Sequence, residues 1–585
     1  MEKSKPRSKI GQVLVILSLF TLFLDLSLLS PHTNKSHLNL LIVTPIVLLN
    51  VYVLRKMATL FSYLPTKKIS PHPVLIPVSI FVIIRLMYLD AIPRWDGSQY
   101  FQALINGINA FNLSPKSFID NFNWYGHPTM GYAFIASISQ LINPTNLFAL
   151  NLSNVIFGVA GVFSFFIICS KIFGRKNQFE VILLTTIFSV SPLFISISTT
   201  FGPDFGSIIF FLAFLACFLS DKLILSIFFG SLLVFTKETG AYTYGLFAIG
   251  YLILTRFSQK SKTLLIPLLF LLIYYLAIKF RYWSPDGNSF LSWGDSCRFC
   301  FGIKKFNILQ NLSVIYLLNF NWLYSLVILI SMMKGALDFI KDRHRSSAAS
   351  SRQETLRAIN LSLVGFTVFF MLFVIYIMPR YMVLGLPLLL ISFYGFLNNL
   401  VPSTIQRRIF MFILILLLSI QNFRTIDPVS KTVFGTYQFG NHQVLKIGTE
   451  YLADGLVYNM QYIYIQRLLD TFIQENSISS RDNIFIDPYA WGTFQTGWGH
   501  FIQSQPQIIY SLDTPNKLPN DLYFLTFPFM RYGGLELNKI QNSFVPPIIE
   551  TRVVLQELSK TYEIIESKKI EIDGYWIQIY RLKRI

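Results

Sequence analysis

Charged residues are scarce in this chain of 585 residues, where Asp, Glu, Lys and Arg together make up 14%. Acidic residues are the scarcer kind, with 30 Asp and Glu against 49 Lys and Arg. So little charge, with a hydrophobic fraction of 53% and a mean hydropathy of +0.51, excludes an ordinary soluble protein. Repeated apolar runs of about 20 residues instead predict helices that span a bilayer.

The net charge of +19 does not indicate nucleic-acid binding, because of where it lies. From Arg424 to Ile585 there are 15 basic and 16 acidic residues, so the excess belongs to the apolar part of the chain. There the Lys and Arg residues stand mostly in short loops, which is the pattern of cytosolic loops in membrane proteins. We therefore expect contact with membrane lipid and no nucleic-acid partner.

Cysteine is also rare, and four residues do not make a disulfide framework. Cys169 and Cys217 lie in apolar runs and are expected to serve packing. Cys297 and Cys300, in DSCRFC, fall in an expected external loop. A local disulfide, two free thiols and half of a zinc site all remain open there.

The apolar runs predict a polytopic α-helical membrane protein with about thirteen transmembrane helices. We place them near residues 11–30, 39–54, 73–92, 147–170, 179–199, 205–220, 223–236, 240–256, 263–280, 312–333, 358–377, 382–399 and 409–423. A cytosolic N-terminus then puts the loops rich in Lys and Arg inside, at 55–68, 171–176, 221–222, 256–262, 334–357 and 402–408. The start, MEKSKPRSKIG, resembles a signal peptide, but the long apolar run after it lacks a cleavage site and predicts an uncleaved helix.

Residues 93–146 are predicted to form one long external loop. MGYAFIASISQLI, from Met130, has about 13 apolar residues, too few to span comfortably. If it did span, the basic loop KIFGRK would fall outside, so we expect a helix on the outer membrane surface. External loops of this length are usually functional.

After Arg424 the composition becomes that of a soluble α/β domain. HQVLKIGTEYLADGLVYNMQYIYIQRLLDTFIQ predicts a helix, and NIFID, QIIYSL and DLYFLTF predict strands. VVLQELSKTY predicts a second helix, and KKIEIDGYWIQIYRL a hairpin turning at Asp573 and Gly574. The expected domains are N-terminal helices 1–72, a transmembrane module 73–423 and an extracytoplasmic domain 424–585.

Ionisable residues at the ends of membrane helices are candidates for function, because charge near lipid is costly. The predicted topology puts one set of them on the outer side: Asp96 and His127 in the first external loop, Asp204 in TTFGPDFGS, Lys237 and Glu238 in FTKETGAY, and Arg380 and Tyr381 in IMPRYMVLGLP. Although far apart in the sequence, they can form a single polar cavity.

Each of these residues also has a structural alternative. Helix caps would account for Asp96 and Asp204, a satisfied structural histidine for His127, an interfacial ion pair for Lys237 and Glu238, and an interfacial anchor for Arg380. Asp25 and Glu180 are expected to have no part in the site. The coincidence of the others on one side is what favours function.

The order of these features resembles the C-type (GT-C) glycosyltransferases, in particular family 39, with the protein mannosyltransferases and lipid A aminoarabinose transferases. The matching stretches are RWDGSQYF, YGHPTMGYAFIASISQLI, SVSPLFISISTTFGPDFG, GSLLVFTKETGAY and PRYMVLGLPLL, in that order between about residues 75 and 400. The chain departs from the family at Gly97, where Glu often follows the catalytic Asp, and in its His-Pro-Thr motif. PYAWGTFQTGWGHF does not match the Trp-Trp-Asp-Tyr-Gly signature of the oligosaccharyltransferases.

The resemblance implies transfer of a sugar from a polyprenyl-phosphate donor to an acceptor hydroxyl on the extracytoplasmic side, usually with inversion. It makes Asp96 the general base and Asp204 a second acid, which orients the acceptor or shares a divalent metal such as Mg or Mn with Asp96. Arg380, helped by Lys237, would bind the lipid phosphate. The remaining expected substrate-binding residues are Trp95, Tyr100, His127, Glu238 and Tyr381.

The absence of a nucleotide-binding motif from the sequence agrees with a lipid-linked donor. The acceptor, whether lipid, polysaccharide or protein, is left open, and a bacterial inner membrane is the expected location. Two alternatives remain: a transporter or flippase of lipid-linked sugars, and a catalytically inactive scaffold. A transporter of this kind tends to have repeated halves and charges near the midplane.

Overall fold

A computed structural model describes fourteen main stretches of the chain: 72–91, 147–174, 177–270, 322–341, 351–373, 379–423, 437–439, 442–445, 458–478, 481–485, 507–509, 519–526, 551–572 and 575–585, with 272–273, 312 and 315–316 in addition. Several predictions lie outside these residues: the first two spans, the loop 93–146 with Trp95, Asp96, Tyr100 and His127, the surface helix from Met130, Cys297 and Cys300, and the hairpin turn at Asp573 and Gly574. The chain forms two compact units, Met1–Asp90 with Tyr100–Val457, and Ala91–Gln99 with Tyr458–Ile585.

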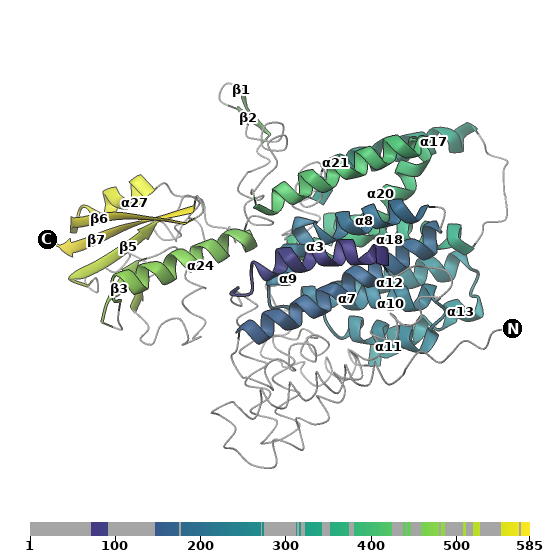
Figure 1. Cartoon of the computed structure of the whole chain (residues 1–585), viewed down its shortest axis with the longest axis horizontal. Helices are drawn as coiled ribbons and strands as arrows, with labels where there is room; N and C mark the ends of the chain where they lie inside the picture. Colours follow the sequence, from purple (N-terminus) through teal and green to yellow (C-terminus); the bar gives the residue numbers. More distant parts are fainter. Residues whose placement is uncertain are drawn as a thin grey trace, which may run out of the picture. The chain divides into compact units, whose positions relative to one another are not determined.

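The described part of the first unit is mostly helical (Figure 1). Its elements are η1 (His72–Val74), α3 (Leu75–Leu86), α7 (Leu147–Phe173), α8 (Gln178–Ser189), α9 (Pro192–Thr199), α10 (Pro203–Leu219), α11 (Leu223–Val234), α12 (Glu238–Leu254), α13 (Gln259–Lys262), α17 (Trp322–Lys341), α18 (Ser351–Phe373), α19 (Pro379–Met382), α20 (Gly385–Leu400), α21 (Thr404–Phe423) and the strands β1 (Tyr437–Phe439) and β2 (His442–Leu445).

Within the described residues, two helices are long and apolar enough to cross a membrane, Phe148–Phe173 and Arg352–Met371. Shorter apolar helices accompany them, including α3 and α11 with 12 residues each. A helix of that length extends only about 18 Å, against a hydrocarbon core of about 30 Å. The chain has the apolar helices expected of an integral membrane protein, but the prediction of thirteen spans is not confirmed.

The span predicted at 179–199 is a bent pair of helices, α8 and α9, which meet at 48°. The bend follows from Pro192, which begins α9, because the residue before a proline is driven out of the helical region. Ser191 accordingly has φ −61° and ψ 121°. If the pair is counted as one span, the described residues contain three.

Helix α10 forms the centre of this unit, with every residue from Pro203 to Phe218 buried. It packs against α7, α11 and α12. The contact with α12 is aromatic, since the Phe214 ring lies 4.8 Å from that of Tyr244 and Phe218 lies 5.0 Å from Tyr251. Large apolar side chains are exposed instead on other helices, such as Ile83 on α3, Ile253 on α12 and Phe412 on α21. Such exposure suits helices that face lipid.

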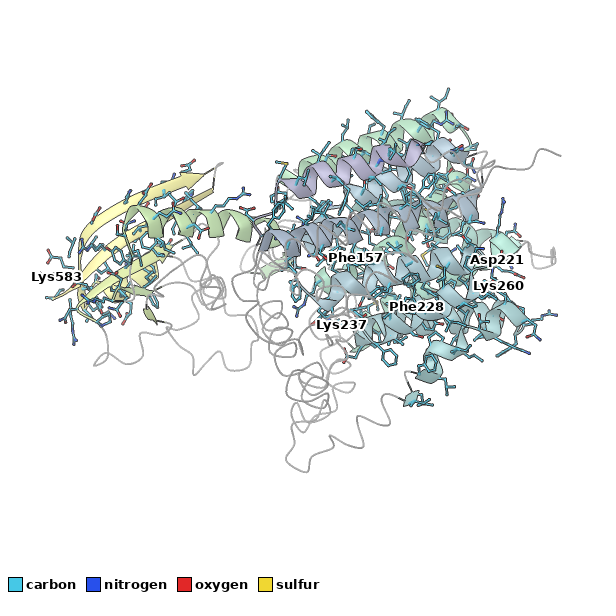
Figure 2. All side chains as sticks on the ribbon, turned by 60° about the horizontal axis from the view of Figure 1, so that its bottom comes forward. Phe157, Asp221, Phe228, Lys237, Lys260 and Lys583 are labelled. Atoms are coloured by element: carbon cyan, nitrogen blue, oxygen red, sulfur yellow. The ribbon has the colours of Figure 1, made fainter. Side chains whose placement is uncertain are left out.

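Side chains of opposite charge form ion pairs near the loops that were predicted to be cytosolic. Glu180 is 1% exposed, and its carboxylate accepts from Arg408 Nε at 3.1 Å, which joins the starts of α8 and α21. Asp221, in the turn that follows α10, and Lys260, on α13, pair at 2.6 Å. Figure 2 shows Asp221 and Lys260 at the opposite end of these helices from Lys237. Both pairs therefore join helix ends.

The second unit contains α24 (Tyr458–Glu475), β3 (Asn483–Phe485), β4 (Gln507–Ile509), β5 (Asp521–Thr526), α27 (Thr551–Leu558), β6 (Tyr562–Ile572) and β7 (Tyr575–Arg584). The strands form one mixed sheet in the order β4-β3-β5-β7-β6. Strand β3 is parallel to β4 and β5, whereas β7 is antiparallel to β5 and β6. The three predicted strands, the second helix and the terminal hairpin are thus confirmed.

The long helix predicted from His442 is wrong in its first part. The residues His442–Leu445 form strand β2, which pairs antiparallel with β1. The helix begins only at Tyr458. A local pattern does not reveal such a pairing, because cross-strand contacts decide whether a short segment becomes a strand.

Candidate functional site

Asp204 and Lys237 face each other at one end of the buried helices. Asp204 stands in the first turn of α10, which begins at Pro203, a favoured first helical residue. Its carboxylate oxygens both accept from Lys237 Nζ, at 2.7 and 2.8 Å. The N-cap of α10 is Gly202, so the structure does not use Asp204 as the N-cap.

This ion pair is almost completely buried, with side chains 10% exposed for Lys237 and 8% for Asp204. A pair withdrawn from water in this way depends on both partners, since removing one leaves an uncompensated charge. Lys237 is the N-cap residue of α12, with extended φ −166° and ψ 154°. Its extended backbone lies just before the first helical turn, and from there the side chain reaches back to α10.

The lack of a side chain at Gly240 allows the start of α12 to approach α10 and α11 closely. A Cβ at this position would lie 2.9 Å from Leu233 O and 3.2 Å from Ser207 Oγ. Leu233 belongs to the last turn of α11, and Ser207 to α10. The first turn of α12 thus packs directly on backbone, and Lys237 is held three residues before this contact.

We expect Gly240→Ala to destabilise the protein by about 1–3 kcal/mol, because the new methyl group meets a carbonyl oxygen that cannot rotate away. Thermal unfolding in detergent measures the change. Gly245→Ala, on the same helix, is the matched control, since its nearest neighbour would be Leu268 Cδ2 at 4.0 Å. There the higher helix propensity of Ala is expected to stabilise by up to about 1 kcal/mol. Equal effects at both positions would contradict the close approach.

Tyr381 joins the ion pair to Arg380. Lys237 Nζ lies 4.5 Å from the centre of the Tyr381 ring, and the Arg380 guanidinium carbon lies 5.1 Å from it. Arg380 Nη2 also donates to the Tyr381 hydroxyl at 3.3 Å. Cations are attracted to aromatic rings at such distances. The short helix α19 therefore presents a second cation beside the buried pair.

A row of aromatic rings leads away from Tyr381 between α18 and α12. The ring of Phe370 lies 6.4 Å from that of Tyr381, and Phe369 lies 5.4 Å from Phe370. Phe369 in turn stacks on Tyr242 of α12 at 3.8 Å. An apolar wall thus adjoins the charged groups, as a ligand with one ionic end and one apolar end would require.

The structure brings together four of the predicted site residues, Asp204, Lys237, Arg380 and Tyr381. Glu238 follows Lys237 in the first turn of α12 and is partly exposed. Trp95, Asp96, Tyr100 and His127 lie outside the described residues. The meeting of Asp96 with Asp204 therefore remains a prediction.

The expected divalent metal between Asp96 and Asp204 finds little support at Asp204. Both of its oxygens already accept from an ammonium group, which takes the place that a cation would occupy. Among the described residues there is no group of three or more His, Cys, Asp and Glu that could hold a metal ion. This donor set does not fit a metal, and no step proposed below requires one.

Comparison with solved structures adds one finding. The chain is similar in structure to ArnT. The crystal structure of ArnT from Cupriavidus metallidurans bound to undecaprenyl phosphate has a TM-score of 0.41 and 11% identity, over 88% of this chain and 98% of that chain. The apo-state structure of the same protein has a TM-score of 0.40 and 11% identity, over 87% and 97%.

No protein-family model and no curated protein matches the sequence. TM-scores as low as those for ArnT carry no inference about activity. The resemblance to family 39 stays a prediction from the motifs, and the function proposed below depends on the residues of this chain.

Three further buried polar residues have no place in the sequence-based site: Arg85 on α3 and Asn151 and Asn154 on α7. Arg85 had a detectable signal, because it interrupts the apolar run LIPVSIFVIIRL. The two asparagines, in LNLSNV, resemble many polar residues near a helix start, and their sequence context gives no comparable signal.

Proposed function

We propose that this protein is an integral-membrane glycosyltransferase, which moves a sugar from a polyprenyl-phosphate donor to an acceptor hydroxyl on the extracytoplasmic side, with inversion. The observation that carries the proposal is the buried Asp204–Lys237 pair beside Tyr381 and Arg380. These residues come from three of the five ordered motifs in the sequence. Buried charge at the end of apolar helices indicates function more often than stability.

In the proposed reaction the Asp96 carboxylate takes the proton of the acceptor hydroxyl. The acceptor oxygen attacks the anomeric carbon and forms the new C–O bond, while the bond from that carbon to the phosphate oxygen breaks. The electron pair leaves with the polyprenyl phosphate. A base near the acceptor and cations near the leaving group supply the two kinds of assistance that this step needs.

Arg380 and Lys237 are the proposed phosphate-binding cations. Arg380 offers a planar fork of donors that matches phosphate oxygens. Two Nζ–H groups of Lys237 bond to Asp204, which fixes the ammonium group and leaves its third donor for the substrate. Asp204 is thereby assigned the task of holding Lys237 as well as the acceptor-orienting role expected from the sequence.

The aromatic row from Tyr381 to Tyr242 supports a lipid-linked donor. An isoprenoid chain is apolar, and the partly exposed rings of Phe369 and Tyr242 would contact its first units, while the buried Phe370 packs between Phe369 and Tyr381. A soluble nucleotide sugar would have no use for such a wall. The proposed donor class follows from this combination of cations and aromatic rings.

The proposal is tested with purified protein in lipid nanodiscs, supplied with a panel of polyprenyl-phosphate sugars and acceptor extracts. We expect one donor to be consumed, with release of free polyprenyl phosphate. In proteoliposomes, movement of intact donor across the bilayer without cleavage would contradict the proposal and favour a flippase.

Replacing Arg380 tests the phosphate assignment. We expect Arg380→Ala to weaken donor binding by about 10- to 100-fold, because hydrogen bonds to charged groups are lost, and to leave acceptor binding nearly unchanged. Arg380→Lys should fall between, since it keeps the charge and loses the fork. Arg352→Ala, at the start of α18, removes a guanidinium group away from the candidate site and serves as the control. An unchanged donor affinity in Arg380→Ala would refute the role.

A further inference from the structure

Three buried polar side chains lie together where α3 and α7 pack. Arg85 is 0% exposed, and Asn151 and Asn154 are each 2% exposed. Burying an amide or a charge among apolar helices costs free energy unless hydrogen bonds replace water. The hydrogen-bond partners of these three side chains therefore indicate their role.

Asn151 binds the turn that follows α3. Its Nδ2 group donates to Leu89 O at 3.0 Å, and its Oδ1 accepts from Arg85 Nη2 at 3.3 Å. Arg85 Nη1 donates in turn to Tyr88 O at 3.4 Å. Carbonyls just past a helix end have no intrahelical donor, so these side chains supply one. The chain reaches Asp96 seven residues after Leu89.

Asn154 makes the same kind of bond with a different segment. It stands three residues after Asn151 on α7, on the same face of the helix. Its Nδ2 group donates to Thr200 O at 3.1 Å, just past the end of α9. Asp204 follows Thr200 by four residues. One turn of α7 thus holds the backbone ahead of each of the two acids.

We propose that Asn151 and Asn154, with Arg85, are positioning residues that anchor two segments on one face of α7: residues 87–91, which precede Asp96 in the sequence, and residues 200–205, which contain Asp204. Their effect on catalysis rests on the proposed function. Transfer requires the base and the phosphate-binding groups at fixed separations, and small displacements lower the rate steeply. Substrate binding depends less on that separation, so the proposal predicts a loss in kcat with little change in KM.

Hydrogen exchange tests the anchoring without any assay of activity. Asn151→Ala should speed exchange of the amides at 87–91 by about tenfold, and Asn154→Ala that of the amides at 200–205, each without affecting the other segment. Asn177→Ala is the matched control, because Asn177 Nδ2 donates to Phe173 O at 3.2 Å near the other end of α7. It should leave both segments unchanged. Leu variants at 151 and 154 keep the volume if the Ala variants do not fold.

Kinetics test the consequence. We expect kcat to fall by about 10- to 100-fold in the variants at 151 and 154, with donor KM within about twofold of wild type. Unchanged exchange in both segments would overturn the proposal, and so would faster exchange with normal kcat. If the wild-type protein transfers no sugar, the proposed function fails, and the exchange data still decide whether the asparagines anchor the two segments.

Discussion

Lys237→Met is expected to abolish sugar transfer and to destabilise the protein by about 3–5 kcal/mol. The substitution removes the ammonium group that binds both oxygens of Asp204 and leaves the carboxylate buried without its counter-charge. Release of polyprenyl phosphate measures the loss of transfer, and thermal unfolding in detergent measures the loss of stability.

Two controls separate stability from function. The double variant Asp204→Asn with Lys237→Met carries no buried charge at this position, so we expect most of the stability to return while transfer stays absent. Lys260→Met removes the partner of Asp221, whose side chain is 76% exposed, and should cost less than about 1 kcal/mol with normal transfer. A Lys237→Met protein with wild-type stability and turnover would exclude the proposed role of the pair.

Asp96→Asn is expected to lower turnover by about 10²- to 10⁴-fold, which is the usual contribution of a general base, and to leave membrane insertion intact. Asn keeps the size of the side chain and cannot accept the proton of the acceptor hydroxyl. Asp90→Asn, in the turn after α3, gives the same charge change six residues earlier and should transfer at the wild-type rate. Unimpaired turnover in Asp96→Asn would assign the base to another residue.

The gathering of Asp204, Lys237, Arg380 and Tyr381 follows from a simple property of the sequence. Each residue stands where an apolar run ends, and helices that alternate in direction bring every second end to the same side. That reasoning needs only the number of helices between two residues. It does not need their packing.

What the sequence did not reveal are the direct contacts. Whether Lys237 reaches Asp204 depends on the rotation of α10 and α12 about their axes, and Gly240 contributes by packing closely on Leu233 of α11 and Ser207 of α10. For the same reason, the prediction of a metal at Asp204 did not take this ammonium group into account. The hydrogen bonds of Asn151 and Asn154 likewise depend on tertiary neighbours that no local pattern contains.

Two differences between the predicted and the observed fold had different causes. The bend at Ser191 had a local signal in Pro192. The prediction of a span from the length of the apolar run did not take this proline into account. The strand at His442–Leu445 had a partner in Tyr437–Phe439, and pairing outweighed helix propensity. The effect of a single residue such as Pro192 can be predicted from the sequence, whereas the partner of a strand is known only from the folded structure.

The Asp204–Lys237 pair also bears on how the chain is made. Synthesis proceeds from the N-terminus, so the acid precedes its base by 33 residues, a separation that includes all of α11. The basic residue in the segment between Asp204 and Lys237 is Lys222, which follows the far end of α10, so Asp204 is without its own partner until Lys237 has been added. The pair can form only when the ribosome has added the start of α12, so α10, α11 and α12 together are the smallest group of helices in which this carboxylate has its counter-charge.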